Sequence, residues 1–385
     1  MFRRARSYIY LGAIFSFLAM SGSANSGDLT LTESISGGFR YDNNVRVQPE
    51  GQVSDEDFVT VISPQLQLAS EHERIQLTGA YALSASFYFA NPDLNNLAHS
   101  VNAGINMTLS PSTSLSFNDR IGYSRDSLEA TLTGIQRERT STLSNAFSVG
   151  FAHAFTARTS GSISLSDTMY RYESAAATTT TRTDSASVGI GFTATQRTSL
   201  FASYGFTNIN YDTSTGVNNF LIHSLQAGFG YQISPSIQLN LSGGTVYTPT
   251  IATSRTDWIA SGAITKSFER SSLNFGYVRN MTDTSGLVSE LNIHDTYTLG
   301  VGHKLTDKVD IALEGNYSTN RTTPSSTLDL ESYSAGISGS WRPYSWMTVS
   351  LGYNHFEQVS HGIIGSDFKR DNIFLNFTAT RSRRL

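Results

Sequence analysis

Polar and apolar residues alternate with a period of two along most of the chain. In residues 75–89 the odd positions carry Ile75, Leu77, Tyr81, Leu83, Phe87 and Phe89. The even positions between them carry mostly Gln, Thr, Ser and Ala, and the same period recurs at 101–109, 237–242 and 347–354. Successive side chains of a β-strand point to opposite faces, so this pattern predicts strands with one apolar face.

The length of the alternating runs separates two environments for these strands. A soluble β-sandwich also alternates, but its strands average ~5–6 residues, whereas membrane-spanning strands need at least ~9–11. The runs here extend over ~12–15 residues, above that requirement. Charged residues make up only 15% of the chain, yet 22 Phe and 18 Tyr argue against disorder. The sequence therefore predicts strands whose apolar face contacts lipid.

The turns fall into two classes that take alternate places along the chain. Tight polar links occur at Glu71–Arg74, Ser110–Thr113, Thr156–Thr159, Thr195–Thr198, Ser234–Ser236, Phe268–Ser271, Thr306–Lys308 and Arg342–Ser345. Looser polar connections lie between them, at Gln48–Glu56, Leu128–Glu138, Ala175–Thr181, Thr213–Asn219 and Ser360–Ser366. Short turns on one side and longer loops on the other are typical of outer-membrane barrels. With a strand at each terminus, the count is about eighteen strands, or sixteen if one hairpin is lost, and both termini are periplasmic.

The lipid environment requires such a sheet to close. An unpaired backbone N–H or C=O in hydrocarbon costs several kcal/mol, so an open sheet edge cannot persist there. We therefore expect Leu29–Asp42 to lie beside Phe368–Thr380, which gives an all-β, antiparallel, up-and-down transmembrane β-barrel. Pro64 lies within an alternating run and removes one ladder bond, so we expect a bulge or a strand end at that point.

The N-terminal residues have the features of a secretory signal. Arg3, Arg4 and Arg6 precede an apolar run from Tyr8 to Met20, and the small residues Gly22-Ser23-Ala24 follow. A run of about 13 residues is shorter than the ~20 that span a bilayer, so we predict a cleaved signal peptide at 1–24. Residues 25–385 then form the barrel in the outer membrane of a Gram-negative bacterium. Alternation begins within a few residues of that site, which argues against a plug domain.

The polar face of the predicted strands consists mostly of Ser, Thr, Gly, Asn and Gln, as at Ser162, Ser164 and Ser166. Eighteen strands enclose more space than such side chains can fill, so we expect a water-filled pore. Parity assigns to the pore lining Arg40, Asp42, Tyr88, Arg120, Tyr170, Tyr172, Asp310 and Glu314. Neutral hydroxyls and amides with scattered aromatics suit a carbohydrate, although these residues could also merely hydrate the interior. No connection exceeds roughly 15 residues, so we expect no long loop inside the pore.

Two acidic residues depart from this pattern. Asp119 and Asp167 fall on the nominal lipid side at equivalent depth, where a carboxylate is costly. Either a bulge shifts the register there or both residues sit near an interface, and we expect a bulge.

Catalytic and cofactor-binding patterns are missing from the sequence. The 8 His are scattered, with no HExxH spacing and no GxSxG elbow, and His294-Asp295 is the only adjacent His/Asp pair. The chain has no Cys, which excludes thiolate metal sites and covalently attached haem. A net charge of −4 gives no basic footprint for nucleic acid. We predict neither an enzyme nor a metal or cofactor site.

One stretch carries a family resemblance. Residues 37–45 read GGFRYDNNV, residues 61–68 read VISPQLQL, and a turn with Glu73-Arg74 leads into the strand Leu77–Phe89. This succession resembles the outer-membrane barrels known as putative β-barrel porin 2, which are similar to barrels encoded with exosortase and exopolysaccharide systems. The resemblance implies a role in carrying a secreted polysaccharide and brings no catalytic or ligand residues. The tail with Arg381, Arg383 and Arg384 departs from the aromatic C-terminal residue recognised during barrel assembly.

Three functions remain open at this point. The first is a non-enzymatic pore for export of an exopolysaccharide, acting with periplasmic export components. The second is a general or sugar-selective diffusion porin, and the third is a scaffold barrel that holds a surface partner. Each of them requires outer-membrane lipids and the barrel-assembly machinery as partners.

Overall fold

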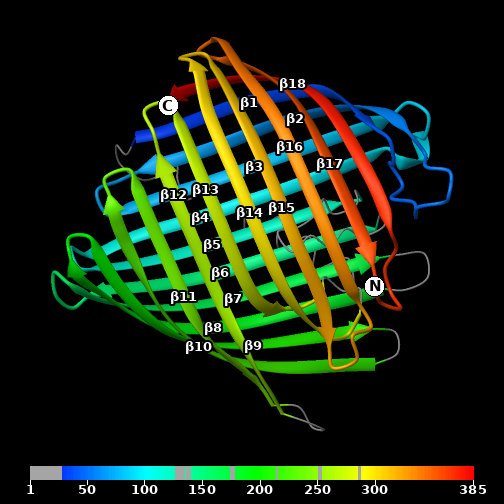
Figure 1. Ribbon diagram of the computed structural model, residues 1–385. Helices are drawn as coiled ribbons and strands as arrows, with labels where there is room; N and C mark the ends of the chain where they lie inside the picture. The colour runs from blue at the N-terminus through cyan, green and yellow to red at the C-terminus, as the bar shows by residue number, and fades with distance from the viewer. Residues whose placement is uncertain are drawn as a thin grey trace, which may run out of the picture.

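The computed structural model describes residues 28–125, 135, 140–173, 178–213, 216–249, 254–284 and 288–385, so the predicted signal peptide at 1–24 lies outside the described residues. The described residues form one closed antiparallel barrel of eighteen strands (Figure 1). The strands are β1 (Asp28–Asp42), β2 (Asp57–Glu71), β3 (Ile75–Tyr88), β4 (Asn96–Ser110), β5 (Thr113–Ser124), β6 (Ser141–Ala154), β7 (Thr159–Glu173), β8 (Thr178–Thr195), β9 (Thr198–Thr213), β10 (Gly216–Ser234), β11 (Ile237–Thr248), β12 (Arg255–Ser267), β13 (Ser271–Thr282), β14 (Leu291–Thr306), β15 (Val309–Thr323), β16 (Asp329–Tyr344), β17 (Met347–Ser360) and β18 (Phe368–Arg384). A short 3-10 helix, η2 (Pro92–Leu94), lies between β3 and β4. No helix in these ranges is long and apolar enough to span a membrane.

The first and last strands close the barrel. β1 pairs with β2 on one side and with β18 on the other, in an unbroken register from Thr30 opposite Arg384 to Asp42 opposite Asn372. The pairing predicted from the cost of an open edge is therefore confirmed, and so is the count of eighteen rather than sixteen strands.

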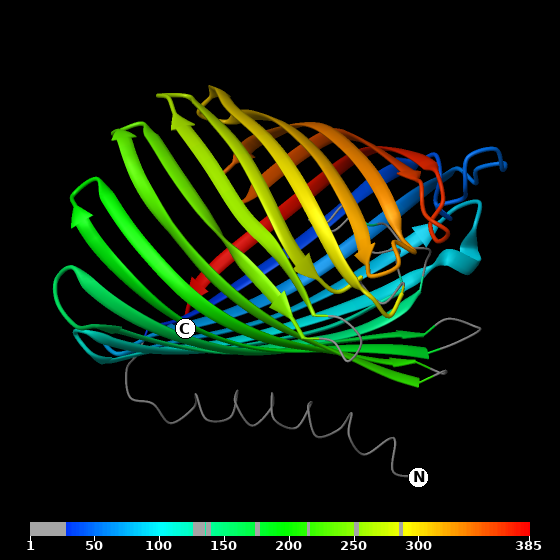
Figure 2. The same ribbon diagram turned by 60° about the horizontal axis from the view of Figure 1, so that its bottom comes forward.

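The two ends of the barrel differ in their connections (Figure 2). All eight predicted tight links lie at junctions of consecutive strands, although the one predicted at Arg342–Ser345 is shifted, because β16 continues to Tyr344 and β17 begins at Met347. The end that carries these links is called the turn end. The start of β1 and the end of β18 also lie there, and the opposite end is called the loop end. The looser connection expected at Thr213–Asn219 is wrong, because β9 continues to Thr213 and β10 begins at Gly216.

The outer face carries the features of a lipid-facing surface. Tyr277, Tyr297, Tyr317 and Tyr333 stand opposite one another on four successive strands, with ring centroids 4.8, 6.0 and 4.9 Å apart. At the turn end Trp341, Tyr344 and Trp346 are exposed, and exposed aliphatic residues such as Leu299, Leu313 and Ile337 lie between the two levels. Aromatic belts at both edges of an apolar band are characteristic of transmembrane barrels.

Pro64 interrupts neither β2 nor its register. It lies opposite Ile35 of β1, and the pairs Ile62–Ala85 and Gln65–Ala82 flank it in the same register toward β3. Between these two pairs, Ser63 and Pro64 have no partner in β3. The expected bulge or strand end is wrong, because the missing N–H removes bonding on one side only and the pairing with β1 keeps the strand in place.

The bulge expected at Asp119 and Asp167 is also wrong. The register runs unbroken through Ala103, Asp119, Phe147, Asp167 and Asp184 on five successive strands, so both carboxylates stay on the outer face. Asn145 Nδ2 donates a 2.7 Å hydrogen bond to Asp119, and Arg182 Nε donates a 2.7 Å hydrogen bond to Asp167. Polar partners on the neighbouring strands stabilise these carboxylates without a change of register.

Candidate functional site

The candidate site is the lumen, and its half near the turn end has a neutral polar wall. Residues of the inner face such as Gln65, Gln67, Ser162, Ser164 and Asn240 are exposed there. Because these side chains alternate with lipid-facing ones on the same strands, the surface to which they are exposed is the interior. This half of the barrel is a water-accessible vestibule lined mainly by hydroxyl and amide groups.

The half near the loop end is packed instead. Every strand except β5 contributes at least one buried side chain near this end, among them Asp42 on β1, Tyr88 on β3, Leu330 on β16 and Phe368 on β18. The same inner face is therefore solvated toward one end of the barrel and filled with side chains toward the other.

Two sets of contacts at the loop end join parts of the barrel that are not neighbouring strands. Ile135, in the connection between β5 and β6, is buried against Leu328 and Leu330 at the β15–β16 hairpin. In an eighteen-stranded barrel these two hairpins stand on opposite walls, so Ile135 reaches across the mouth. Separately, the Tyr211 hydroxyl of β9 donates to the Glu290 carbonyl oxygen at 2.9 Å and accepts from the Thr284 N–H at 3.2 Å, in the β13–β14 connection.

The base of the loop at 43–56 also lies inside the mouth. Val45 packs against Val59 and Tyr88 on one side, and Val47 packs against Phe356 and Phe368 on the other. The tip of the loop is exposed. A connection of modest length, and not a long constriction loop, fills the mouth at this end because it brings apolar side chains of its own.

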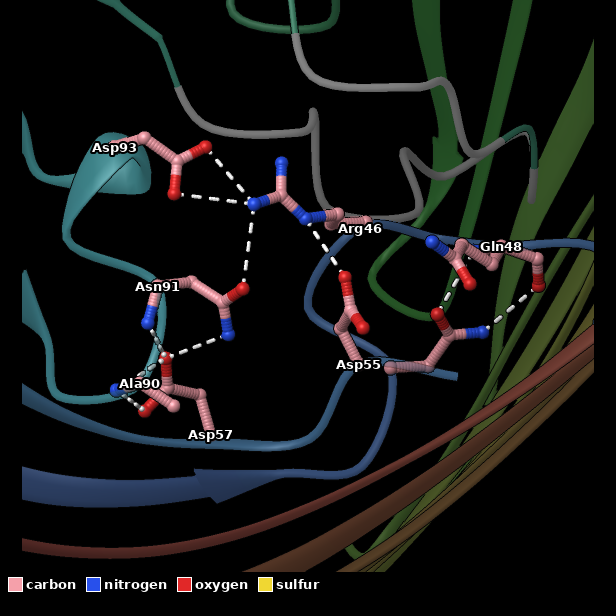
Figure 3. A network of polar contacts seen from close by, with 8 residues as sticks. Arg46, Gln48, Asp55, Asp57, Ala90, Asn91 and Asp93 are labelled. Carbon is pink, nitrogen blue, oxygen red and sulfur yellow. Dashed lines mark hydrogen bonds and ion pairs between the residues drawn. The ribbon is translucent and has the colours of Figure 1, made fainter. Parts of the chain in front are cut away.

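A polar network fixes this loop to its neighbour (Figure 3). Arg46 Nε donates to Asp55 Oδ2 at 2.8 Å, and Arg46 Nη2 donates to Asp93 Oδ2 at 2.8 Å. The hydrogen bond to Asp93 is the largest cause that raises the pKa of Arg46 above its ordinary value. At the start of β2, the Asp57 carboxylate accepts backbone N–H groups of Ala90 and Asn91 at 2.9 Å each. The network ties the loops on either side of the β2–β3 hairpin to each other.

Three of the sequence-predicted pore residues come together beside this loop. Asp42 is fully buried and accepts hydrogen bonds from Arg370 Nε at 3.1 Å and Nη2 at 2.6 Å. Arg40 approaches Asp42 at 4.0 Å and donates a 3.4 Å hydrogen bond to the Tyr88 hydroxyl. The sequence analysis identified neither Arg370 nor Ile135. Arg370 could have been found, because it lies on the inner face of a strand already expected beside Asp42. For Ile135 the sequence carries no signal of this kind.

The other five predicted residues lie apart from this cluster. Tyr170 and Tyr172 of β7 stack with ring centroids 6.0 Å apart and an interplanar angle of 9°, and Tyr172 is buried. Arg120 is exposed on β5, and Asp310 is bound to Arg342 near the turn end. Glu314 is exposed opposite Gly300 and Gly336, and within the described ranges it forms no ion pair. No group of side chains suited to a metal ion occurs in those ranges either.

Part of the barrel matches a known protein family. Residues 24–185 match the family putative beta-barrel porin 2. The matched residues contain the loop at 43–56, Asp57, Tyr88, Arg120 and the Tyr170–Tyr172 stack. The part of the lumen matched by the porin family thus includes most of the sequence-predicted pore residues, whereas Arg370, Asp310 and Glu314 lie beyond it.

Solved structures support the same fold class at low sequence identity. The siderophore receptor PirA from Pseudomonas aeruginosa has a TM-score of 0.53 at 7% identity, covering 91% of this chain and 80% of that one. Acinetobacter baumannii OccAB4 has a TM-score of 0.51 at 10% identity, covering 93% and 99%. No curated protein matches the sequence. The chain has the fold of outer-membrane porins and receptors.

Proposed function

We propose that this barrel is a non-enzymatic pore for export of an exopolysaccharide across the outer membrane, and that its loop end is a gate. The observation that supports the proposal is the solvated wall of neutral hydroxyl and amide groups in the vestibule, as at Ser162, Ser164 and Asn240. Such groups exchange hydrogen bonds with a carbohydrate as readily as with water, and they impose no strong field on a neutral chain. Tyr170, which is partly exposed and stacks on the buried Tyr172, adds an aromatic surface suited to the apolar face of a sugar ring.

The asymmetry of the lumen gives the proposal a direction. Outer-membrane barrels carry their short turns on the periplasmic side, so the vestibule would open to the periplasm and receive the polymer there. Periplasmic export components would then dock around the turn end. The packed loop end would prevent leakage until polymer or a partner displaces the contacts around Ile135 and Arg46.

Planar-bilayer recordings test this function. The purified barrel should show low basal conductance with rare openings, and neutral polysaccharide fragments added to the turn-end side should reduce the open current. An inserted, folded barrel that never conducts, even after Ile135→Ala loosens the mouth, would contradict a pore and favour a scaffold role. Liposome swelling with small sugars at a rate that polysaccharide fragments leave unchanged would indicate a diffusion porin.

A further inference from the structure

The outer face of the barrel has an apolar groove at the seam where the sheet closes. The groove has a volume of about 810 Å³ and crosses β18, β1, β2 and β3 near the turn end. Ile35 lies between Ala379 and Pro64 in register, and these two small outward residues leave space between larger neighbours. Those neighbours are Leu66, Leu83 and Trp346. The volume lies within the ~300–1,000 Å³ typical of ligand sites.

One rim of the groove carries two charged lining residues, Glu33 and Arg381. Arg381 lines the groove and is exposed, and it forms no ion pair with any described part of the chain. Glu33, which stands opposite it, is bound instead by Arg383 at 3.1 Å. The guanidinium of Arg381 therefore stands beside an apolar groove at the level of Trp346, in the aromatic belt at the turn end.

We propose that this groove binds one anionic phospholipid, with an acyl chain in the groove and the headgroup phosphate on Arg381. A lipid is the occupant that the location favours, because the groove faces hydrocarbon and its charged rim lies at an aromatic belt. An acyl chain gains little hydrophobic free energy by leaving other acyl chains, so the apolar lining alone selects no particular lipid. A guanidinium binds the phosphate oxygens of any phospholipid through charge-assisted hydrogen bonds. Selection comes from the net charge of the headgroup, because an anionic headgroup lacks the choline cation that repels Arg381 in phosphatidylcholine.

Native mass spectrometry of the detergent-solubilised barrel tests the site with an equimolar mixture of phosphatidylglycerol and phosphatidylcholine. Wild-type protein should retain one phosphatidylglycerol in preference to phosphatidylcholine. Arg381→Gln should reduce the retained phosphatidylglycerol about fivefold, the factor that corresponds to about 1 kcal/mol of attraction per cation near a lipid surface. Ala379→Phe fills the groove and should reduce retention of both lipids.

Arg158→Gln is the matched control, because Arg158 is an exposed cation in a tight link of the same barrel end, away from the groove. It should retain lipid as wild type does. Folded protein is identified by its heat-modifiable electrophoretic mobility. If Ala379→Phe does not fold, Arg381→Gln still tests the lipid site, because Arg381 is exposed. Equal retention of both lipids by wild type, or unchanged phosphatidylglycerol on Arg381→Gln, would overturn the proposal.

Discussion

The buried ion pair between Asp42 and Arg370 gives the sharpest test of the packed loop end. The Asp42 side chain is 0% exposed and that of Arg370 is 8% exposed. Loss of one partner of a buried pair costs about 3–5 kcal/mol, because the charge that remains has lost the ion-pair partner that offset its desolvation. Asp42→Ala also removes the acceptor of the Asn44 N–H, 3.1 Å away, which anchors the base of the loop. We therefore expect each single variant, Asp42→Ala and Arg370→Ala, to destabilise the barrel by about 3 kcal/mol or more.

The two single variants and the double variant form a cycle that isolates the pair. Once Asp42 is gone, removal of Arg370 also removes a buried charge that has lost its ion-pair partner. The free energy of unfolding lost in the double variant should therefore be smaller than the sum of the two single losses by about 1–3 kcal/mol. The measurement is urea unfolding in phosphatidylcholine vesicles, followed by fluorescence of the 3 Trp residues.

An exposed ion pair in the same barrel supplies the control. Arg171 and Glu173 are 2.6 Å apart, but their side chains are 42% and 51% exposed. Solvent screening limits such a pair to about 0–1 kcal/mol. If Asp42→Ala cost no more than Glu173→Ala, or if the cycle for Asp42 and Arg370 were additive, the interpretation of a packed, low-dielectric mouth would be wrong.

Three further substitutions test the gate and the lumen. Ile135→Ala removes a buried contact across the mouth worth about 2–5 kcal/mol, so single-channel recordings should show at least a tenfold rise in open probability; an unchanged value would contradict the gate. Arg46→Ala breaks two partly exposed ion pairs worth about 0.5–2 kcal/mol together, so open probability should rise about two- to thirtyfold. Glu314→Gln removes an exposed carboxylate from the lumen, so the reversal potential in a salt gradient should shift in the direction of higher anion permeability. The anion-to-cation permeability ratio should rise less than about tenfold, because salt screens the charge within ~10 Å. No shift would place Glu314 outside the ion path.

The sequence was sufficient to predict the strands, the tight turns and the closure. Alternation defines which residues face lipid, and the eight tight links define the hairpins, because both are local properties of consecutive residues. The pairing of β1 with β18 followed from the cost of an open edge in lipid, which does not depend on particular side chains.

The errors arose where side chains from separate strands meet. Asp119 and Asp167 indicated a bulge only as long as their partners Asn145 and Arg182, on the neighbouring strands, were unknown. Pro64 lost its bonding on one side without shifting the register.

The packed mouth was missed for a related reason. The length of a loop does not reveal whether its base turns inward. The apolar residues Val45 and Val47, in a segment otherwise rich in Asn, Gln and Asp, were the available signal. Ile135 had no such signal, because the residues that it contacts, Leu328 and Leu330, lie on the opposite wall of the barrel.

The uneven filling of the lumen has an electrical consequence. Salt solution in the vestibule conducts, so a voltage applied across the membrane falls mainly over the short packed layer rather than over the full height of the barrel. Each elementary charge that crosses that layer gains or loses about 2.3 kcal/mol per 100 mV. Asp42, Arg370 and Arg46 lie in or beside this layer, so rearrangement of their pairs would make opening of the barrel depend on the polarity of the applied voltage.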